Sequence, residues 1–218
     1  MTTHRLSQSA LTLNEFLDGL ADRTPTPGGG SAAALAGALA AAMARMVGAY
    51  SVGKKPDDEH AATVQSLCDQ LAQADAMLRR LMDEDATAYE ALSAAQRAKR
   101  QGRDDPPARE QAVGVALAVP METAAVAGAS LVAMQQLLPH ANPHLLSDLG
   151  VAAVLADACV RAAAYSVRVN APLLESSAQR EEILGQLADM LRRSAAAASA
   201  IESHLPEAIR PTSRAPAE

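Results

Sequence analysis

The fold of this chain is decided by residues 25–45, PTPGGGSAAALAGALAAAMAR. Proline and three glycines interrupt the chain, and an alanine-rich run with a single charge, Arg45, follows them. We expect a helix from about Ser31 to Val52, because the apolar run continues to that point and a Gly-Lys-Lys-Pro turn follows it. Small residues such as Ala33, Gly37 and Ala44 would let neighbouring helices approach closely. This helix is therefore expected to be the central, most buried one.

Outward from this helix, apolar residues recur at spacings of three and four, which predicts an all-α protein. Thr12 and Glu15 have the spacing of a capping box and open a short helix. Further helices are expected at about 57–100 with room for one break, 108–138 with Pro120 inside it, 147–170 capped by Ser147, and 176–205. The prediction is an antiparallel bundle of about five to six long helices, a single domain over residues 1–205, and a disordered tail at 206–218.

The composition of the 218 residues excludes several classes of function. A net charge of −6 and an aromatic content of 2% leave neither the basic surface nor the stacking rings of a nucleic-acid-binding protein. The longest apolar run, residues 32–44, is too short for a membrane span, and residues 1–15 contain no signal peptide. Two distant cysteines and five histidines show no metal-ligand spacing. We expect a cytoplasmic homodimer that pairs through flat alanine-rich helix faces and binds no metal, membrane or nucleic acid.

Asp85 interrupts an apolar stripe on the third long helix. The stripe steps by three or four residues from Leu71 to Leu92, so Asp85 should point toward the core. Burial would raise its pKa toward the range that suits proton transfer. The alternative is a structural carboxylate bonded to a neighbouring helix terminus, and the sequence leaves both open. Asp83 lies on another face, where pairing with Arg79 and Arg80 would explain it.

Two other groups of residues allow both a functional and a structural interpretation. Glycines 28–30 precede a helix and could bring a ligand to its backbone amides, or they could form a hinge. Asp148 and Asn170 share one face of the fifth helix but lie about 33 Å apart along it. Asp148 also suits a first helical turn and Asn170 a helix C-terminus, so structure alone could explain them.

Together these motifs resemble the cyclodeaminase/cyclohydrolase family, over about residues 13–205. The matching segments are PTPGGGSAAA at 25–34, Met46-Val47, Gly53-Lys54-Lys55, DEDATAY at 83–89, Val119-Pro120, Ser147-Asp148 and Val169-Asn170. The family comprises the C-terminal domain of formiminotransferase-cyclodeaminase and bacterial methenyltetrahydrofolate cyclohydrolases. This chain departs from the family pattern at Pro56 and at residues 140–144, which bears on how a substrate would fit.

The resemblance implies an all-helical dimeric enzyme that acts on one-carbon folates without a metal or cofactor. It places the catalytic aspartate on Asp85 and suggests Lys54 as a second catalytic residue, one that exchanges a proton with the folate or holds its glutamate tail. The implied substrate-binding residues are Pro27, Gly28, Gly29, Gly30, Ser31, Tyr89, Pro120, Asp148 and Asn170.

Helix lengths indicate which of these residues can meet. If the second and third helices are antiparallel, Asp85 lies about 40 Å along its helix and returns to the level of glycines 28–30. Pro120 and Asn170 fall at the same level, whereas Lys54 and Asp148 fall at the opposite end. We therefore expect Lys54 and Asp148 either to reach the site from the partner subunit or to serve structure.

The implied reaction is hydrolysis of 5,10-methenyltetrahydrofolate to 10-formyltetrahydrofolate, with Asp85 activating water. The alternative enzyme is a formiminotetrahydrofolate cyclodeaminase, in which N10 attacks the formimino carbon and ammonia leaves. The absence of a formiminotransferase domain from these 218 residues favours the cyclohydrolase. A third hypothesis, from another class, is a catalytically silent helical oligomer.

Overall fold

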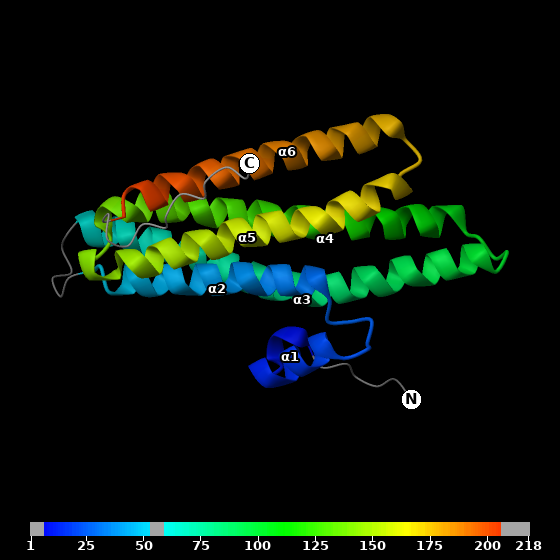
Figure 1. The fold of residues 1–218 in the computed structure, drawn as a ribbon, viewed down its shortest axis with the longest axis horizontal. Helices are drawn as coiled ribbons and strands as arrows, with labels where there is room; N and C mark the ends of the chain where they lie inside the picture. The colour runs from blue at the N-terminus through cyan, green and yellow to red at the C-terminus, as the bar shows by residue number, and fades with distance from the viewer. Residues whose placement is uncertain (1–6, 53–58, 206–218) are drawn as a thin grey trace, which may run out of the picture.

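A computed structural model describes residues 7–52 and 59–205, which form helices and no strand (Figure 1). The all-α prediction is confirmed. Lys54, Lys55, Pro56 and the tail at 206–218 lie outside the described residues. The helices are η1 (Gln8–Ala10), α1 (Leu13–Ala21), α2 (Gly29–Ala49), α3 (Glu59–Arg100), α4 (Pro106–Leu137), η2 (Leu138–His140), η3 (Pro143–Leu145), α5 (Leu146–Asn170), η4 (Ala171–Leu173) and α6 (Ser177–Ser203).

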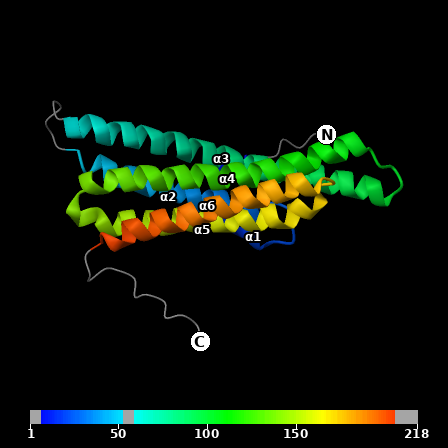
Figure 2. The same cartoon turned by 90° about the horizontal axis from the view of Figure 1, so that it is seen from above.

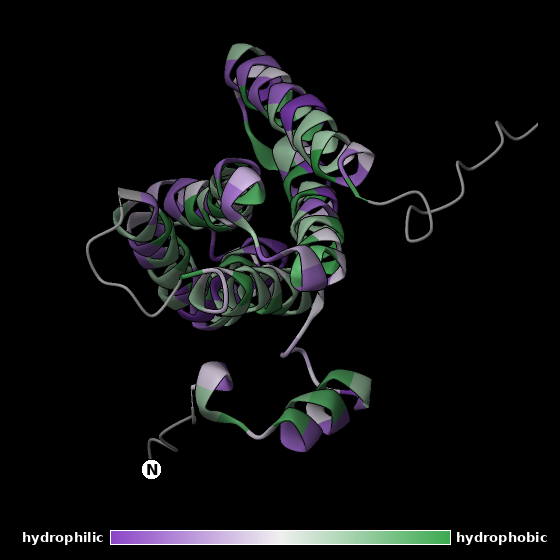
Figure 3. Ribbon diagram, turned by 90° about the vertical axis from the view of Figure 1, so that its left-hand side faces the viewer, coloured by the Kyte–Doolittle hydropathy of each residue, from purple (hydrophilic) through white to green (hydrophobic). Residues whose placement is uncertain are grey.

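The four helices α2–α5 form an antiparallel bundle. Helix α2 packs against α3 and α5, α3 against α4, and α4 against α5, so the four close into a ring. Helix α6 lies along α5 and α4 on the outside of this ring (Figure 2). Figure 3, which looks along the helices, shows η1 and α1 beside the main bundle. Phe16, the only phenylalanine, is the residue of α1 that reaches the core.

Small residues form the contact between α2 and α5. The buried positions of α2 include Ala33, Ala34, Gly37, Ala40, Ala41 and Ala44, and those of α5 include Ala152, Ala153, Ala156, Cys159, Ala163 and Ala164. At Gly37 an added Cβ would stand 2.8 Å from the Cys159 sulfur and 3.1 Å from Leu78. The two helices can approach this closely only because these side chains are absent or short. The predicted close packing of α2 through small residues is thus confirmed, but α2 is one of four helices in the ring, with Leu39 and Met46 exposed, and not a central one.

The helices of the ring have unequal lengths. Helix α2 begins at Gly29, near the level of Asp85, which binds Ser31, while α3 continues beyond Asp85 to Arg100, a length of about 22 Å. Figure 1 shows α3 extending past the start of α2. Helices α4 and α5 accompany this extension, and the core beside it contains residues of α3, α4, α5 and α6 but none of α2. The ring therefore has an open position beyond the start of α2.

Several local predictions hold. Thr12 and Glu15 form a reciprocal capping box at α1, and the Ser176 hydroxyl accepts a hydrogen bond from the Gln179 amide at the start of α6. Pro120 lies inside α4, as expected. The stripe on α3 is also confirmed, because Leu71, Leu78, Leu81, Ala88 and Leu92 are buried.

Other local predictions are wrong. Helix α2 ends at Ala49 rather than Val52, whereas α3 runs unbroken from Glu59 to Arg100, one of the two possibilities that the sequence left open. Ser147 does not cap α5, because the 3-10 turn η3 runs directly into that helix at Leu146. Asp83 does not pair with the arginines: it accepts hydrogen bonds from Ser7 Oγ (2.6 Å) and the Gln8 amide (2.5 Å) and so holds η1 against α3.

Two helices are long and apolar enough to cross a membrane by length and composition alone, namely Gly29–Ala49 and Pro106–His140. Half of the most apolar window of each is buried inside the bundle. The core helices of soluble bundles have the same properties, so this finding does not by itself argue for a membrane protein.

The α2–α5 contact gives a stability prediction. We expect Gly37→Val to lower the free energy of unfolding by about 1–3 kcal/mol, because the branched side chain must displace Cys159 and Leu78. The control is Gly185→Val on the exposed side of α6, where an added Cβ meets nothing within 4 Å. The control should change stability by less than about 0.5 kcal/mol. Urea unfolding measures both, and equal effects would contradict close packing at Gly37.

Candidate functional site

Asp85 binds the first turn of α2. Its Oδ2 accepts hydrogen bonds from the Ser31 backbone amide (2.9 Å) and from the Ser31 hydroxyl (3.0 Å). The N-cap residue of α2 is Gly28, which has no side chain to cap the helix. A carboxylate from α3, 54 positions away in sequence, therefore satisfies one of the free amides at the positive end of the α2 dipole.

Gly30 leaves the space that the Asp85 carboxylate occupies. A Cβ at Gly30 would overlap the Oδ1 and Cγ atoms of Asp85, whereas a Cβ at Gly29 would meet nothing within 4 Å. The requirement for glycine at position 30 is thus steric and comes from a residue on another helix. Of the two glycines, only Gly30 is needed for this approach.

Burial raises the pKa of Asp85 above its ordinary value of 3.8, and the two hydrogen bonds from Ser31 oppose that rise. Desolvation is the larger effect, so the carboxyl holds its proton more tightly than an exposed aspartate does. The bonds to Ser31 use Oδ2, which leaves Oδ1 for another partner. A partly buried carboxylate with a raised pKa and a free oxygen can accept a proton from a bound molecule.

Asp85 lies on the wall of a cavity of about 440 Å³, at the open position of the helix ring. The segment before α2 forms one side, and α3, α4 and α5 form the others. The lining residues are Pro25, Thr26, Gly28, Gly29, Gly30, Asp85, Ala88, Tyr89, Leu92, Ser93, Gln96, Ala116, Val119, Pro120, Ser166, Val169, Asn170 and Leu173. Most of this wall is apolar, and Asp85 is its one ionisable carboxyl.

The structure brings together most of the residues that the sequence selected. Gly28, Gly29, Gly30, Asp85, Tyr89, Pro120 and Asn170 all line this cavity. Helix counting had placed Pro120 and Asn170 level with Asp85, and that expectation is confirmed. Asn170 does not serve as a helix cap: its side-chain amide donates to the Ala116 carbonyl of α4, at 2.9 Å.

Three selected residues are not on the cavity wall. Ser31 is fully buried and acts through Asp85, and Pro27, which follows a cis peptide bond, lies against Gly19 of α1. Asp148 is in the first turn of α5, at the far end of the helix from Asn170. The expectation that Asp148 could not share a site with Asn170 in one subunit is confirmed, and Lys54 lies outside the described residues.

Comparison with known proteins shows the family of this chain. A model of the formiminotransferase-cyclodeaminase family matches residues 12–189. This chain belongs to that family. The methenyltetrahydrofolate cyclohydrolase of Methylorubrum extorquens is 33% identical over 189 residues, which cover 85% of this chain and 91% of that protein.

Two further members of the formiminotransferase-cyclodeaminase family resemble this chain. The formimidoyltransferase-cyclodeaminase of Rattus norvegicus is 30% identical over 185 residues, 83% of this chain and 34% of that protein. The crystal structure of formiminotetrahydrofolate cyclodeaminase from Thermotoga maritima superposes with a TM-score of 0.82 at 26% identity, covering 90% of this chain and 96% of that one. The chain thus spans about a third of the rat protein and nearly all of the Thermotoga chain.

Several residues of the cavity that contains Asp85 were not selected from the sequence. Leu92, Ser93 and Gln96 extend the wall along α3 beyond Tyr89, and Ser166 adds a hydroxyl from α5. Positions 85, 89, 92 and 96 step by four, three and four residues, so the face of α3 that carries Asp85 also contains Leu92 and Gln96. Leu92 is already the last residue of the stripe that the sequence predicts, and one more turn of that stripe reaches Gln96.

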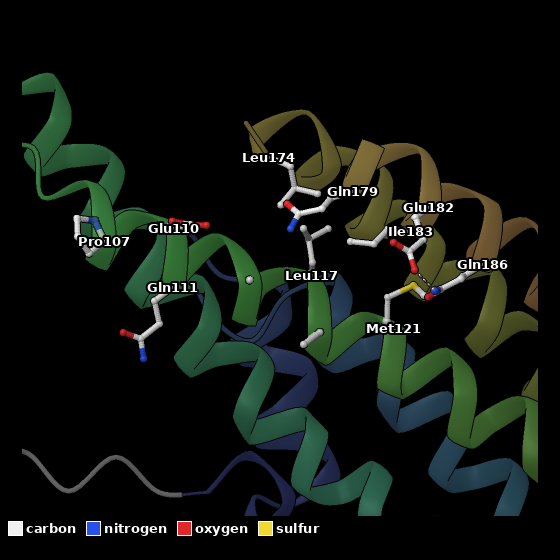
Figure 4. A pocket seen from close by; sticks show the side chains of 12 residues that line it. Pro107, Glu110, Gln111, Leu117, Met121, Leu174, Gln179, Glu182, Ile183 and Gln186 are labelled. Carbon is white, nitrogen blue, oxygen red and sulfur yellow. Dashed lines mark hydrogen bonds between the residues drawn. The ribbon is translucent and has the colours of Figure 1, made fainter. Parts of the chain in front are cut away.

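A larger cavity, about 710 Å³, lies elsewhere, between α4 and α6 (Figure 4). Leu117, Met121, Leu174 and Ile183 form its apolar part, and glutamate and glutamine side chains such as Glu110 and Gln186 surround them. Glu110 and Glu182 are exposed. We assign the site to the smaller cavity, because it contains the half-buried carboxyl with a raised pKa.

No group of three or more His, Cys, Asp or Glu side chains within residues 7–52 and 59–205 is arranged to hold a metal ion. The histidines that come closest, His60 and His140, have their Nδ1 atoms 2.9 Å apart, well away from the cavity wall. Cys159 is buried, and burial raises its pKa to about 12, so it remains a neutral thiol.

The raised pKa of Asp85 predicts how stability depends on pH. The folded protein holds this proton more tightly than the unfolded chain does, so the free energy of unfolding falls as pH rises through the interval above 3.8. At pH 7 the ionised carboxylate costs stability. We therefore expect Asp85→Asn to be more stable than the wild type at pH 7, and the difference to close near pH 3.

Urea unfolding of both proteins at the two pH values measures this difference. Glu84→Gln is the matched control, because Glu84 is the neighbouring acid, half-exposed and paired with Arg80 at 2.9 Å. An Asp85→Asn protein that is clearly less stable at pH 7 would show that the charged carboxylate serves mainly as a helix cap.

Proposed function

We propose that this protein hydrolyses 5,10-methenyltetrahydrofolate to 10-formyltetrahydrofolate. The observation that carries the proposal is Asp85, held by Ser31 on the wall of a mostly apolar cavity with one oxygen free and a raised pKa. The family membership supports it, as does the similarity to the Methylorubrum cyclohydrolase over 91% of that protein.

Hydrolysis of the methenyl compound requires one base beside a cationic carbon. The methenyl carbon between N5 and N10 carries delocalised positive charge, which an adjacent carboxylate stabilises. Asp85 accepts a proton from water as the water oxygen bonds to this carbon. The bond from the carbon to N5 then breaks, N5 takes up a proton, the formyl group stays on N10, and one proton is released overall.

The part of the site at the start of α2 suits the cationic ring of the substrate better than its anionic tail. The Ser31 amide is already bound by Asp85, so the glycine segment offers fewer free amides than the sequence suggested. A second carboxylate there would be repelled by Asp85. Ala88, Leu92 and Val119 supply aliphatic walls for a pterin ring, with Tyr89 as the one aromatic side chain beside them.

We further propose that the reaction needs no metal or cofactor and takes place in the cytoplasm. The substrate's reacting carbon is already cationic, so attack by water requires a base but no additional electrophile. Water is the only co-reactant in the balanced equation.

A formiminotetrahydrofolate cyclodeaminase activity is the second candidate. The similarity to the Thermotoga maritima cyclodeaminase, at a TM-score of 0.82, favours it. In that reaction N10 attacks the formimino carbon and ammonia leaves, so Asp85 would move protons between nitrogens instead of activating water. Ammonia release from 5-formiminotetrahydrofolate separates this activity from hydrolysis of the methenyl compound.

We also propose a homodimer that pairs through α2 and α5. The large exposed apolar side chains of these helices, with Tyr50 directly after α2, are Leu39, Met46, Tyr50, Val151, Val154, Tyr165 and Val169. A second copy stacked antiparallel on this face would bring its Asp148 end toward this chain's cavity. In that arrangement Asp148 acts on the site of the other subunit, and the expectation that Lys54 does the same stays a prediction.

Removing the base should abolish activity without unfolding the protein. We expect Asp85→Asn to lower kcat for methenyltetrahydrofolate by a factor of about 10²–10⁴, since an amide cannot take the water proton. The near-ultraviolet absorbance of the methenyl compound follows the reaction. In the wild type the rate should rise with pH through the raised pKa of Asp85, because only the ionised carboxylate is a base.

Two matched controls sharpen this test. Glu84→Gln removes the neighbouring acid and should keep wild-type activity, because Glu84 is not on the cavity wall. Gly30→Ala should lose activity because it displaces the Asp85 carboxylate, whereas Gly29→Ala should not displace it. Equal rates for Asp85→Asn and wild type would remove Asp85 from the mechanism, and wild-type protein without activity on either folate would favour a silent oligomer.

The dimer proposal has its own test. Val154 on α5 and Val132 on α4 are 49% and 50% exposed, so glutamate at either position meets similar solvent in a monomer. We expect Val154→Glu to halve the mass measured by light scattering after size exclusion, and Val132→Glu to leave it unchanged. A wild-type monomer, or dissociation by Val132→Glu alone, would contradict the α2–α5 interface.

A further inference from the structure

Pro120 leaves one carbonyl of α4 without its helical partner. In an α-helix the carbonyl of residue 116 accepts from the amide of residue 120, and proline has no amide hydrogen to give. Ala116 is buried, and both Ala116 and Pro120 line the candidate cavity. A buried carbonyl without a donor costs free energy, so another group is needed here.

Asn170, the last residue of α5, supplies that donor. Its Nδ2 donates to the Ala116 carbonyl oxygen at 2.9 Å. A carbonyl oxygen can only accept, so the bond fixes which end of the amide faces Ala116. The same bond determines where the amide oxygen Oδ1 lies, and Asn170 is itself part of the cavity wall.

We propose that Pro120 is a positioning residue for Asn170, and that it makes Oδ1 a fixed hydrogen-bond acceptor for an N–H group of the ligand ring. This inference rests on the proposed folate site and specifies its ligand: a heterocycle that presents a donor at this wall. A reduced pterin has such donors in its ring N–H groups and its amino group. A ring that presents a carbonyl oxygen to Oδ1 would place two hydrogen-bond acceptors against each other, so it would bind less well.

A purely structural pair would affect stability alone. Restoring an amide at position 120 would then satisfy Ala116 within its own helix, release Asn170 and leave ligand binding unchanged. The proposal predicts instead that Pro120→Ala keeps or improves the fold, because alanine is the better helix former, yet weakens binding because Asn170 is no longer held.

A double-mutant cycle tests this inference. We expect Pro120→Ala and Asn170→Ala each to raise KM for methenyltetrahydrofolate several-fold, up to about 10-fold, with a smaller change in kcat. The double variant should bind no worse than Asn170→Ala, because Pro120 acts only through Asn170. In the double variant Ala116 again has a helical partner, so it folds even if Asn170→Ala alone does not. Independent, additive effects or an unchanged KM in Pro120→Ala would overturn the proposal.

Pro107→Ala is the matched control, since Pro107 is in the first turn of the same helix, where its missing amide hydrogen has no helical partner. It should leave KM unchanged, and a rise equal to that of Pro120→Ala would overturn the proposal.

A second readout does not depend on activity. The side-chain amide of Asn170 should show slow hydrogen exchange by NMR in the wild type and fast exchange in Pro120→Ala, and protection that persists in the variant would overturn the positioning role. Equilibrium binding of 5-formyltetrahydrofolate to the wild type and variants reports on the ligand contact. If the wild type binds this folate but does not hydrolyse the methenyl compound, the proposed reaction is wrong. The binding affinities of the wild type and the variants then still test the role of Asn170.

Discussion

The contact between the Asp85 carboxylate and the first turn of α2 is the constraint on which the site depends. It requires an amide and a hydroxyl from Ser31, and it requires a residue without a side chain at position 30. It also fixes the level at which α2 begins relative to α3. Because α2 starts there while α3, α4 and α5 continue, the fourth position of the helix ring is vacant beyond Gly29, and the cavity lies in that position.

Both interpretations of Asp85 that the sequence left open, the structural and the functional one, agree with the structure. It is bonded to a neighbouring helix terminus, as the structural interpretation required, and it also lines a cavity, as the functional one required. The direction of its pKa shift separates the two roles. A carboxylate placed only to cap a helix gains from its hydrogen bonds and has a lowered pKa, as Glu15 has in the capping box of α1. At Asp85 the cost of burial exceeds that gain, which is the property that the proposed proton-transfer role requires.

The sequence predicted the helices and the level of each site residue, because both follow from local periodicity and from a rise of about 1.5 Å per residue. Counting along the helices placed Asp85, Pro120 and Asn170 together and Asp148 apart, and the structure agrees. Contacts of single side chains across helices were not predictable in this way. Asp83 was expected to pair within its own helix and instead holds η1, because a segment distant in sequence offers it backbone and hydroxyl donors. Ser147 has the chemistry of a cap, but η3 leads directly into α5.

The scarcity of aromatic residues has a structural counterpart. The three tyrosines are exposed and Phe16 is the only aromatic ring in the core, so alanine, leucine and valine fill the bundle. Helices that pack through alanine lie close together and leave little room between them, as Gly37 and Cys159 show. In such a bundle a cavity therefore arises more readily where a helix is missing than where a large core side chain is replaced by a small one. The start of α2 at the glycine segment leaves such a vacant position, and the first turn of α2 provides the Ser31 donors that hold Asp85 at the edge of the open space.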